Sequence, residues 1–307
     1  MQSPLVSIIT VNFNQAQLTC ELLASIAHLN DRNFEIIVVD NGSNIDPSAQ
    51  ILQQFPDVRF LRSEENLGFA GGNNLGIRAA KGEYLFLVNN DTELSPDVIG
   101  QLLSVFEQQE NVGVVSPKIC FHQTTSGKQE HLIQYVGYTR VHPITARNKT
   151  LGEFEPDKGQ YNQVESTFYA HGAAMMIKKE VVEKAGLMPE LYFLYYEELD
   201  WCEQIRKAGF TIMVEPNAVV YHKESMSVGK ASPMKTYYLT RNRILFMRRN
   251  TDTWQFALFI VYFTFVITPK SVVSYLFHRQ VNHLRSFMAG IKWHFYTPKT
   301  PVHPQIS

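Results

Sequence analysis

Cysteine is scarce in this chain, which contains only Cys20, Cys120 and Cys202 among 307 residues. Three widely spaced cysteines provide neither a zinc site nor a disulfide framework, and they fit a reducing compartment. A basic region before the first apolar stretch, residues 5–11, is also missing. We therefore interpret that stretch as a strand and not as a signal peptide. Charged residues are 19% and hydrophobic residues 45% of the chain, which excludes global disorder and permits a sizeable core.

Acidic residues are nearly absent from the C-terminal part of the chain. From Lys235 onward there are ten lysines and arginines but a single acid, Asp252, so this part carries +9. Residues 1–234 carry −10, and the net charge of −1 conceals the division. We predict a first domain at 1–234 and a basic tail at 235–307 that meets an anionic surface. The negative first domain argues against nucleic acid as a partner.

The usual glycine signatures of nucleotide-binding loops are missing as well. The most glycine-rich stretch, residues 66–76, matches neither G-x-G-x-x-G nor a phosphate loop that ends in Gly-Lys-Ser/Thr. Its glycines permit close backbone approach to a ligand, which Asn73 and Asn74 could bind through hydrogen bonds. A helix with a glycine-rich entry explains the same pattern.

Short apolar runs alternate with segments of helical spacing. Strands are predicted at 5–11, 34–40, 58–61, 84–88 and 112–116, and helices at 15–29, 45–55 and 97–109. This order predicts an α/β fold with a parallel sheet wound by right-handed crossovers. Residues 121–165 are polar and weakly periodic, and we interpret them as an excursion from the sheet.

The run at 84–88 organises the chain, because it reads as a strand buried on both faces. Residues 89–91 follow it directly, and ligands of open α/β sheets bind at the carboxyl ends of strands. Asp91 is suited to hold Mg²⁺ or Mn²⁺ against a phosphate, although these residues could instead make only turn hydrogen bonds. Ser95 and Pro96 then predict a helix start, with Ser95 as the capping residue.

Two more sites carry candidate functional side chains. Glu197, Glu198 and Asp200 open a helix after an aromatic run, where the helix dipole favours acids. Glu198 and Asp200 are two residues apart and point in different directions on a helix, so at most one faces a given site. His222 ends an apolar run and is either a structural histidine or a ligand.

Seven short pieces of the chain between about residues 5 and 245 carry a resemblance to a known family. They are 10–14, 38–43, 66–73, 89–91, 196–200, His222 and 238–243. Each is short, but in this order and spacing they resemble the family-2 glycosyltransferases with a GT-A fold. Within that family the resemblance is to the bacterial rhamnosyltransferase-like branch. It implies a mostly parallel, Rossmann-like sheet flanked by helices.

The resemblance also implies which residues bind the donor. Thr10, Asn12 and Asp40 would bind the base and ribose of a nucleotide-diphospho sugar. Asn73 stands where many relatives carry an arginine near the base, and Asn90, beside the metal-binding position, belongs to the same donor site.

A second set of positions would carry the chemistry. Residues 89–91 stand at the D-x-D position of the family, with Asp91 as the metal-binding acid and Asn89 in place of the first aspartate. His222 matches a histidine that adds a ligand to the metal or the diphosphate. Glu198 stands at the general-base position, where aspartate is more common. The implied reaction is an inverting transfer that depends on Mg²⁺ or Mn²⁺.

The donor expected from the resemblance is a deoxythymidine- or uridine-diphosphate sugar, with rhamnose as the sugar. The acceptor would be a growing lipid-linked glycan, which places the enzyme in cell-surface polysaccharide synthesis. A cytoplasmic position on the inner face of the membrane follows from these expectations. The sequence leaves open whether the protein forms a homo-oligomer.

The tail contains an apolar run at 254–268 that Pro269 and Lys270 interrupt before 272–277. About 15 uninterrupted residues are short of the roughly 20 needed to cross a bilayer, and with the break included the run could barely span one. We predict instead helices that lie in the membrane interface. Trp254, Tyr262 and Tyr275 would anchor them there. The alternative is an amphipathic hairpin packed on the catalytic domain or on a second subunit.

Two other functions compete with this one. A nucleotidyltransferase also combines a parallel sheet with a carboxylate-held metal, but it would show a glycine-rich loop with a basic residue after the first strand. Residues 12–15 read Asn-Phe-Asn-Gln instead. A non-catalytic nucleotide-sugar-binding or scaffold subunit of a glycan-assembly complex is the alternative from another class.

Overall fold

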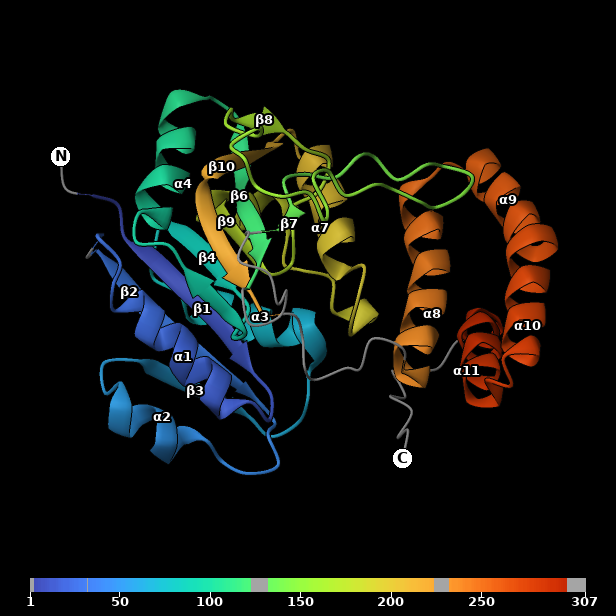
Figure 1. Ribbon diagram of the computed structural model, residues 1–307, viewed down its shortest axis with the longest axis horizontal. Coiled ribbons are helices and arrows are strands. Elements are labelled where there is room, and N and C mark those ends of the chain that lie inside the picture. Colours follow the sequence, from blue (N-terminus) through green and yellow to red (C-terminus); the bar gives the residue numbers. More distant parts are fainter. Residues whose placement is uncertain (1–2, 32, 123–131, 224–231, 297–307) are drawn as a thin grey trace.

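The computed structural model describes residues 3–31, 33–122, 132–223 and 232–296, and in these residues a ten-stranded sheet has helices on both faces (Figure 1). The sheet order is β3-β2-β1-β4-β9-β6-β10-β5, with β7 beside β6 and β8 beside β10. The strands are β1 Val6–Asn12, β2 Phe34–Asn41, β3 Arg59–Ser63, β4 Tyr84–Val88, β5 Thr92–Leu94, β6 Val112–Phe121, β7 Ile133–Tyr135, β8 Glu165–Ser166, β9 Ala174–Lys178 and β10 Thr211–His222. The α-helices are α1 Ala16–Ile26, α2 Ser48–Gln54, α3 Gly68–Ala79, α4 Val98–Gln108, α6 Lys179–Ala185, α7 Glu197–Lys207, α8 Pro233–Asn250, α9 Thr253–Tyr262, α10 Thr268–Phe277 and α11 Val281–Lys292.

Half of the sheet has the predicted parallel arrangement. β3, β2, β1 and β4 are neighbours and run in one direction. Their register pairs Asn12 with Asp40 at the carboxyl ends of β1 and β2. β4 lies between β1 and β9 with its last four side chains buried, which confirms it as a strand covered on both faces. The polar residues after these strands are therefore brought to one edge of the sheet.

The other half is not wholly parallel, which corrects the simple alternation that the sequence predicts. β9 runs antiparallel to both of its neighbours, β4 and β6, and β5 runs antiparallel to β10. Parallel neighbours need a crossover connection, usually a helix. The chain instead reaches β9 through the irregular excursion after β6, and it can enter the sheet in the opposite direction.

Two apolar cores lie on opposite faces of the sheet, because side chains alternate along each strand. Ile9 and Leu87 face the core that α3, α6 and α7 cover, whereas Ile8, Phe86 and Val88 face the core under α1, α2 and α4. The first core continues into the C-terminal helices, which lie beyond α7 in Figure 1. The tail is therefore joined to the rest of the protein through packed side chains.

The start of α4 differs from the prediction. Ser95 does not cap it, because the residue at the N-cap is Asp97, and no side chain caps the helix there. Residues 92–94 form β5 instead, which pairs with the end of β10 and moves the helix start downstream. The Ser-Pro signal does operate at α8, where Ser232 Oγ accepts a hydrogen bond from Lys235 N at 3.1 Å and Pro233 opens the helix.

We predicted that Pro269 interrupts the apolar run of the tail, and this prediction is wrong because the helix continues through Pro269. α9, a π-helical segment at Phe263–Ile267 and α10 form one helix of 25 residues, Thr253–Phe277, which contains an 18-residue window with a mean hydropathy of 1.9. The wider π turn accommodates a proline that cannot donate a backbone hydrogen bond, and Thr268 Oγ1 donates to Phe263 O at 3.0 Å. Within the described residues this helix alone is long and apolar enough to cross a membrane.

Candidate active site

A buried chain of hydrogen bonds joins the ends of β1, β2 and β4. Asn12 Nδ2 donates to Asp40 Oδ1 at 2.8 Å, and Thr19 Oγ1 donates to Asn12 Oδ1 at 2.9 Å. Asn90 Nδ2 completes the chain by donating to Thr19 Oγ1 at 3.1 Å. Three residues that the sequence singled out, Asn12, Asp40 and Asn90, are thus brought together, with Thr19 of α1 as a link that the sequence did not reveal.

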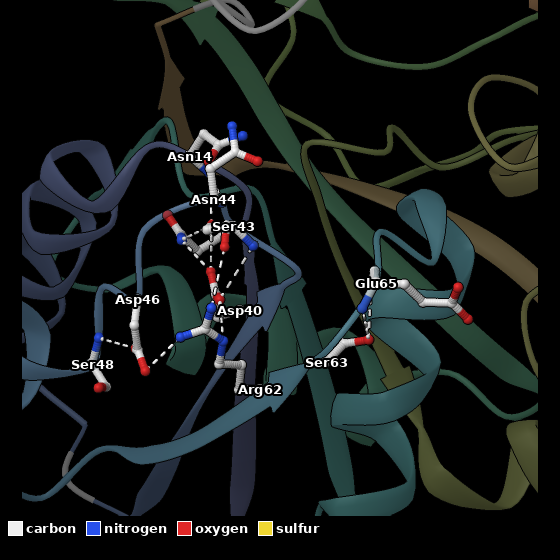
Figure 2. Close-up of polar contacts among 10 residues, drawn as sticks. Asn14, Asp40, Ser43, Asn44, Asp46, Ser48, Arg62, Ser63 and Glu65 are labelled. Carbon is white, nitrogen blue, oxygen red and sulfur yellow. Dashed lines mark hydrogen bonds and ion pairs between the residues drawn. The ribbon is translucent and has the colours of Figure 1, made fainter. Parts of the chain in front are cut away.

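Asp40 lies at the centre of a second network, which shapes the loop after β2 (Figure 2). Ser43 Oγ donates to Asp40 Oδ1 at 2.5 Å, and Arg62 Nε lies 3.5 Å from Asp40 Oδ2. Arg62 also reaches Asp46 with Nη1 at 2.5 Å, and Asn14 N donates to Ser43 Oγ at 2.8 Å. Asp40 is fully buried, so its carboxylate holds this loop against β3 in the structure.

Asp91 and His222 meet at the ends of β4 and β10. His222 Nε2 lies 3.2 Å from Asp91 Oδ1, within ion-pair distance, but the pair is not aligned as a hydrogen bond. His222 Nδ1 lies 2.9 Å from Gln134 Oε1, an acceptor, so a proton on Nδ1 can be donated to that oxygen while Nε2 faces Asp91. Both facing atoms are buried and have no hydrogen-bond partner among the described residues. A cation between the two atoms, or a proton shared by them, would satisfy both.

A turn at residues 171–173 lies between this pair and α7. The His171 ring packs edge-on against His222 with 6.1 Å between centroids, and its Nδ1 accepts from Ala173 N at 3.1 Å. Burial lowers the pKa of His171 to about 3, so the ring is neutral. On the other side, a Cβ added to Gly172 would lie 3.7 Å from Cγ of Glu198. The turn therefore lies beside His222 through His171 and beside Glu198 at Gly172.

The three acids of α7 have three different environments. Burial raises the pKa of Glu198 from 4.5 to about 7, against the effect of its nearby backbone N–H groups. Burial and the charge of Glu198 raise the pKa of Glu197, which is 3% exposed. Asp200 turns away and accepts from Arg249 Nε at 3.0 Å and Gln204 Nε2 at 2.9 Å. This confirms that Asp200 points elsewhere, although its main partners belong to α8 rather than to its own first turn.

Comparison with known proteins identifies the family. Residues 7–186, more than half of the chain, match the family described as Glycosyl transferase family 2. This chain belongs to glycosyl transferase family 2. Its sheet and flanking helices are a GT-A fold, as the resemblance of the sequence implied.

Relatives of this glycosyltransferase cover most of its length. It is 25% identical over 295 residues to the low-salt glycan biosynthesis hexosyltransferase Agl10 of Haloferax volcanii, covering 92% of this chain and 89% of that protein. It is 22% identical over 268 residues to the N-acetylglucosaminyl-diphospho-decaprenol L-rhamnosyltransferase of Mycobacterium tuberculosis, covering 82% and 87%. The solved mannosyltransferase PcManGT from Pyrobaculum calidifontis, in complex with GDP-Man and Mn²⁺, superimposes with a TM-score of 0.57 at 16% identity, covering 96% of this chain and 88% of that one.

The glycosyltransferase has side chains that fit a divalent cation. Asp91 and His222 present two unpartnered, buried acceptors, one a carboxylate oxygen and one an imidazole nitrogen. No group of three or more His, Cys, Asp or Glu side chains suited to a metal occurs within the described ranges. Mg²⁺ is commonly bound by one or two carboxylates together with substrate phosphates and water. Asp91 and His222 would hold such a cation together with substrate phosphates and water.

Of the residues expected to bind the donor, Asn73 makes a hydrogen bond within its own helix and Thr10 is buried. Asn73 Nδ2 donates to Phe69 O one turn earlier in α3, at 2.9 Å. Thr10 is fully buried, and its hydroxyl has no hydrogen-bond partner among the described residues. Their contact with a nucleotide stays a prediction. Sequence reasoning missed Gln134, which fixes the His222 ring, because it lies in the weakly periodic excursion where no pattern marks it.

Proposed function

We propose that this protein is an inverting, metal-dependent glycosyltransferase that moves a sugar from a nucleotide-diphospho sugar to a hydroxyl of a glycan. The observation that carries the proposal is the arrangement around the turn at 171–173. An unpartnered Asp91–His222 pair lies on one side of this turn, and Glu198 lies against the other side. One side is suited to the diphosphate and the other to the acceptor.

Asp91 and His222 would hold Mg²⁺ or Mn²⁺, which neutralises charge developing on the departing diphosphate. Gln134 keeps His222 in the tautomer that presents Nε2 toward Asp91. The Asn12–Asp40 network holds the loop that would enclose the nucleotide. Glu198 accepts the proton of the acceptor hydroxyl, and a pKa of about 7 matches a base that works near neutral pH. Attack from the face opposite the diphosphate inverts the anomeric configuration.

The donor that we propose is a deoxythymidine- or uridine-diphosphate sugar with rhamnose as the transferred sugar. The acceptor is a lipid-linked glycan, so that the reaction contributes to cell-surface polysaccharide synthesis. The mycobacterial relative supports both choices, since its name gives rhamnose as the sugar and a diphospho-decaprenol glycan as the acceptor. PcManGT, which binds a nucleotide sugar together with Mn²⁺, supports the metal.

A peripheral position on the cytoplasmic face of the membrane belongs to the same proposal. Helix Thr253–Phe277 exposes Trp254, Phe265, Val273 and Phe277, with exposed fractions of 65–82%. α10 has no buried residue, whereas α8 and α11 pack on the body of the protein. The exposed apolar helix and the positive charge of the tail both support contact with an anionic lipid surface.

Two measurements test the proposed function. Nucleotide sugars are screened for thermal stabilisation with Mn²⁺ present, and those that bind are assayed for transfer to a lipid-linked glycan. Asp91→Ala should abolish the effect of the metal on donor binding, and chelator should abolish transfer by the unaltered protein. Full transfer in excess chelator contradicts the metal role. A protein that binds donor but neither transfers nor hydrolyses it is the non-catalytic subunit of the alternative.

A further inference from the structure

The turn that precedes α7 has an unfavourable backbone conformation. Phe193, Tyr195 and Tyr196 have φ angles of 65°, 69° and 76°, in the left-handed region that bulky side chains rarely adopt. Tyr196 is the N-cap residue of α7, so Glu197 and Glu198 follow the turn directly. Such backbone persists only where surrounding contacts determine it.

Two adjacent residues of α8, Arg241 and Asn242, contact the backbone of this turn through their side chains. Asn242 Nδ2 lies 3.0, 2.7 and 2.8 Å from the carbonyl oxygens of Tyr192, Leu194 and Tyr195. Arg241 Nη2 donates to the carbonyl oxygens of Leu191 at 2.9 Å and Tyr192 at 2.5 Å. The backbone of the turn is thus held by two side chains that lie about fifty residues later in the chain.

The pair is itself fixed in place. Arg241 Nε donates to Asn242 Oδ1 at 2.7 Å, which leaves the amide nitrogen of Asn242 to face the carbonyls. The Arg241 guanidinium lies over the rings of Tyr238 and Trp293, at 4.9 and 5.0 Å from their centroids. Asn242 is fully buried and Arg241 is 5% exposed. Neither side chain has room to release the turn without a change in packing.

The same turn also orders the glycine-rich helix. Phe193 O accepts a hydrogen bond from Phe69 N at 2.7 Å, in the first turn of α3. Gly68 has φ +74°, and a Cβ there would overlap the Phe193 carbonyl. The turn therefore fixes the first turns of both α3 and α7, and its position decides where Glu198 is directed.

We propose that Arg241 and Asn242 are positioning residues for the transfer reaction, which hold the turn at 193–196 and thereby direct Glu198 toward the acceptor. The inference rests on the proposed function, in which Glu198 is the base. It explains why a buried arginine and a buried asparagine lie side by side on a helix that carries no reacting group.

The decisive variant is Asn242→Asp, which keeps the shape of the side chain but replaces two donors by acceptors that face carbonyl oxygens. We expect kcat to fall by about tenfold or more, since small displacements of a catalytic group have effects of that order. Donor affinity, measured by binding with Mn²⁺ present, should stay within about twofold. Asn242→Gln retains both donors and should recover part of the lost kcat.

Leu245→Ala is the matched control, because Leu245 is a buried residue of the same helix. It should lower the melting temperature and leave kcat near that of the unaltered protein at temperatures where both are folded. Backbone hydrogen exchange in a peptide covering residues 190–199 should accelerate in Asn242→Asp and not in Leu245→Ala.

The proposal is overturned if Asn242→Asp keeps kcat within about twofold, or if its kcat and its donor affinity fall together. An unaltered protein that transfers no sugar refutes the proposed function instead. In that case the exchange measurement alone decides whether the pair holds the turn.

Discussion

Replacing Glu198 with glutamine should make the protein more stable and much less active. Burial raises the pKa of Glu198 from 4.5 to about 7, so the ionised carboxylate is disfavoured in the folded state. A shift of that size corresponds to at most about 3 kcal/mol, and partial contact with solvent reduces our expectation to about 1–2 kcal/mol. Glutamine is neutral and keeps the same size, so Glu198→Gln removes this unfavourable contribution.

The gain in stability should depend on pH. Below pH 4.5 Glu198 is protonated in both the folded and the unfolded state, and the two proteins should have equal free energies of unfolding. As pH rises through 4.5 to about 7, the unfolded state ionises first and the unaltered protein loses stability relative to the variant. At pH 8 the melting temperature of Glu198→Gln should be about 2–3 °C higher.

Activity should change in the opposite direction. Loss of a general base typically lowers the rate about 10²–10⁴-fold, and donor affinity should hardly change because the base acts on the acceptor. In the unaltered protein, transfer should fall about 30-fold between pH 8 and pH 5.5, since only about 3% of Glu198 would be ionised at the lower pH. The residual activity of the variant should lack this dependence.

The assay is single-turnover transfer from pH 5.5 to pH 8, together with thermal unfolding at the two extremes. Glu197→Gln and Asp200→Asn provide the comparison, because both neighbours lie on the same helix. A Glu198→Gln protein with near-normal transfer would refute the assignment, above all if Glu197→Gln proved inactive. If the gain in stability of Glu198→Gln over the unaltered protein is no larger at pH 8 than at pH 5.5, the account of the burial of Glu198 is refuted.

Two further predictions concern stability and the membrane. Asp200→Ala should lower the free energy of unfolding by about 1–3 kcal/mol, because it leaves Arg249 and Asn250 without their buried acceptor, and denaturant unfolding will test this. Phe265→Glu should weaken sedimentation with anionic vesicles at least about tenfold, since Phe265 is 73% exposed on the apolar helix, whereas Ile45→Glu on another surface should not. If the full-length protein does not sediment with such vesicles at low salt, membrane contact is excluded and a protein interface becomes the better explanation of the exposed helix.

The parts of the fold that local pattern determines were predictable. The strand at 84–88 has the predicted bounds, because an unbroken apolar run between polar residues leaves little choice. The direction of β9 was not predictable, since it depends on which strand edges are free when the chain returns from residues 122–173. The continuous helix through Pro269 also escaped prediction, because a π turn within the helix accommodates the proline.

For the site, the sequence located side chains at strand and helix ends but not their partners. Asp91 and His222 were expected to act together, and their side chains do meet. Gln134 could not have been found, because it contacts His222 across 88 positions of sequence. Asn242 belonged to a matching motif, but its hydrogen bonds to the turn before α7 follow from the packing of α8, which no local pattern reveals.

The central position of β9 determines the order in which the molecule can be completed. β4 pairs with β9 through Val88 and Ala174. The edge of β4 that faces β9 therefore stays unpaired until the ribosome has added nearly ninety further residues. At about 5–20 residues per second this interval lasts about 5–20 s, during which an apolar strand edge is open to wrong partners. β9 begins immediately after the turn at 171–173. The strand that joins the two halves of the sheet therefore follows directly after the turn that lies between the Asp91–His222 pair and Glu198, so a nascent chain cannot bring these side chains together before β9 has been made.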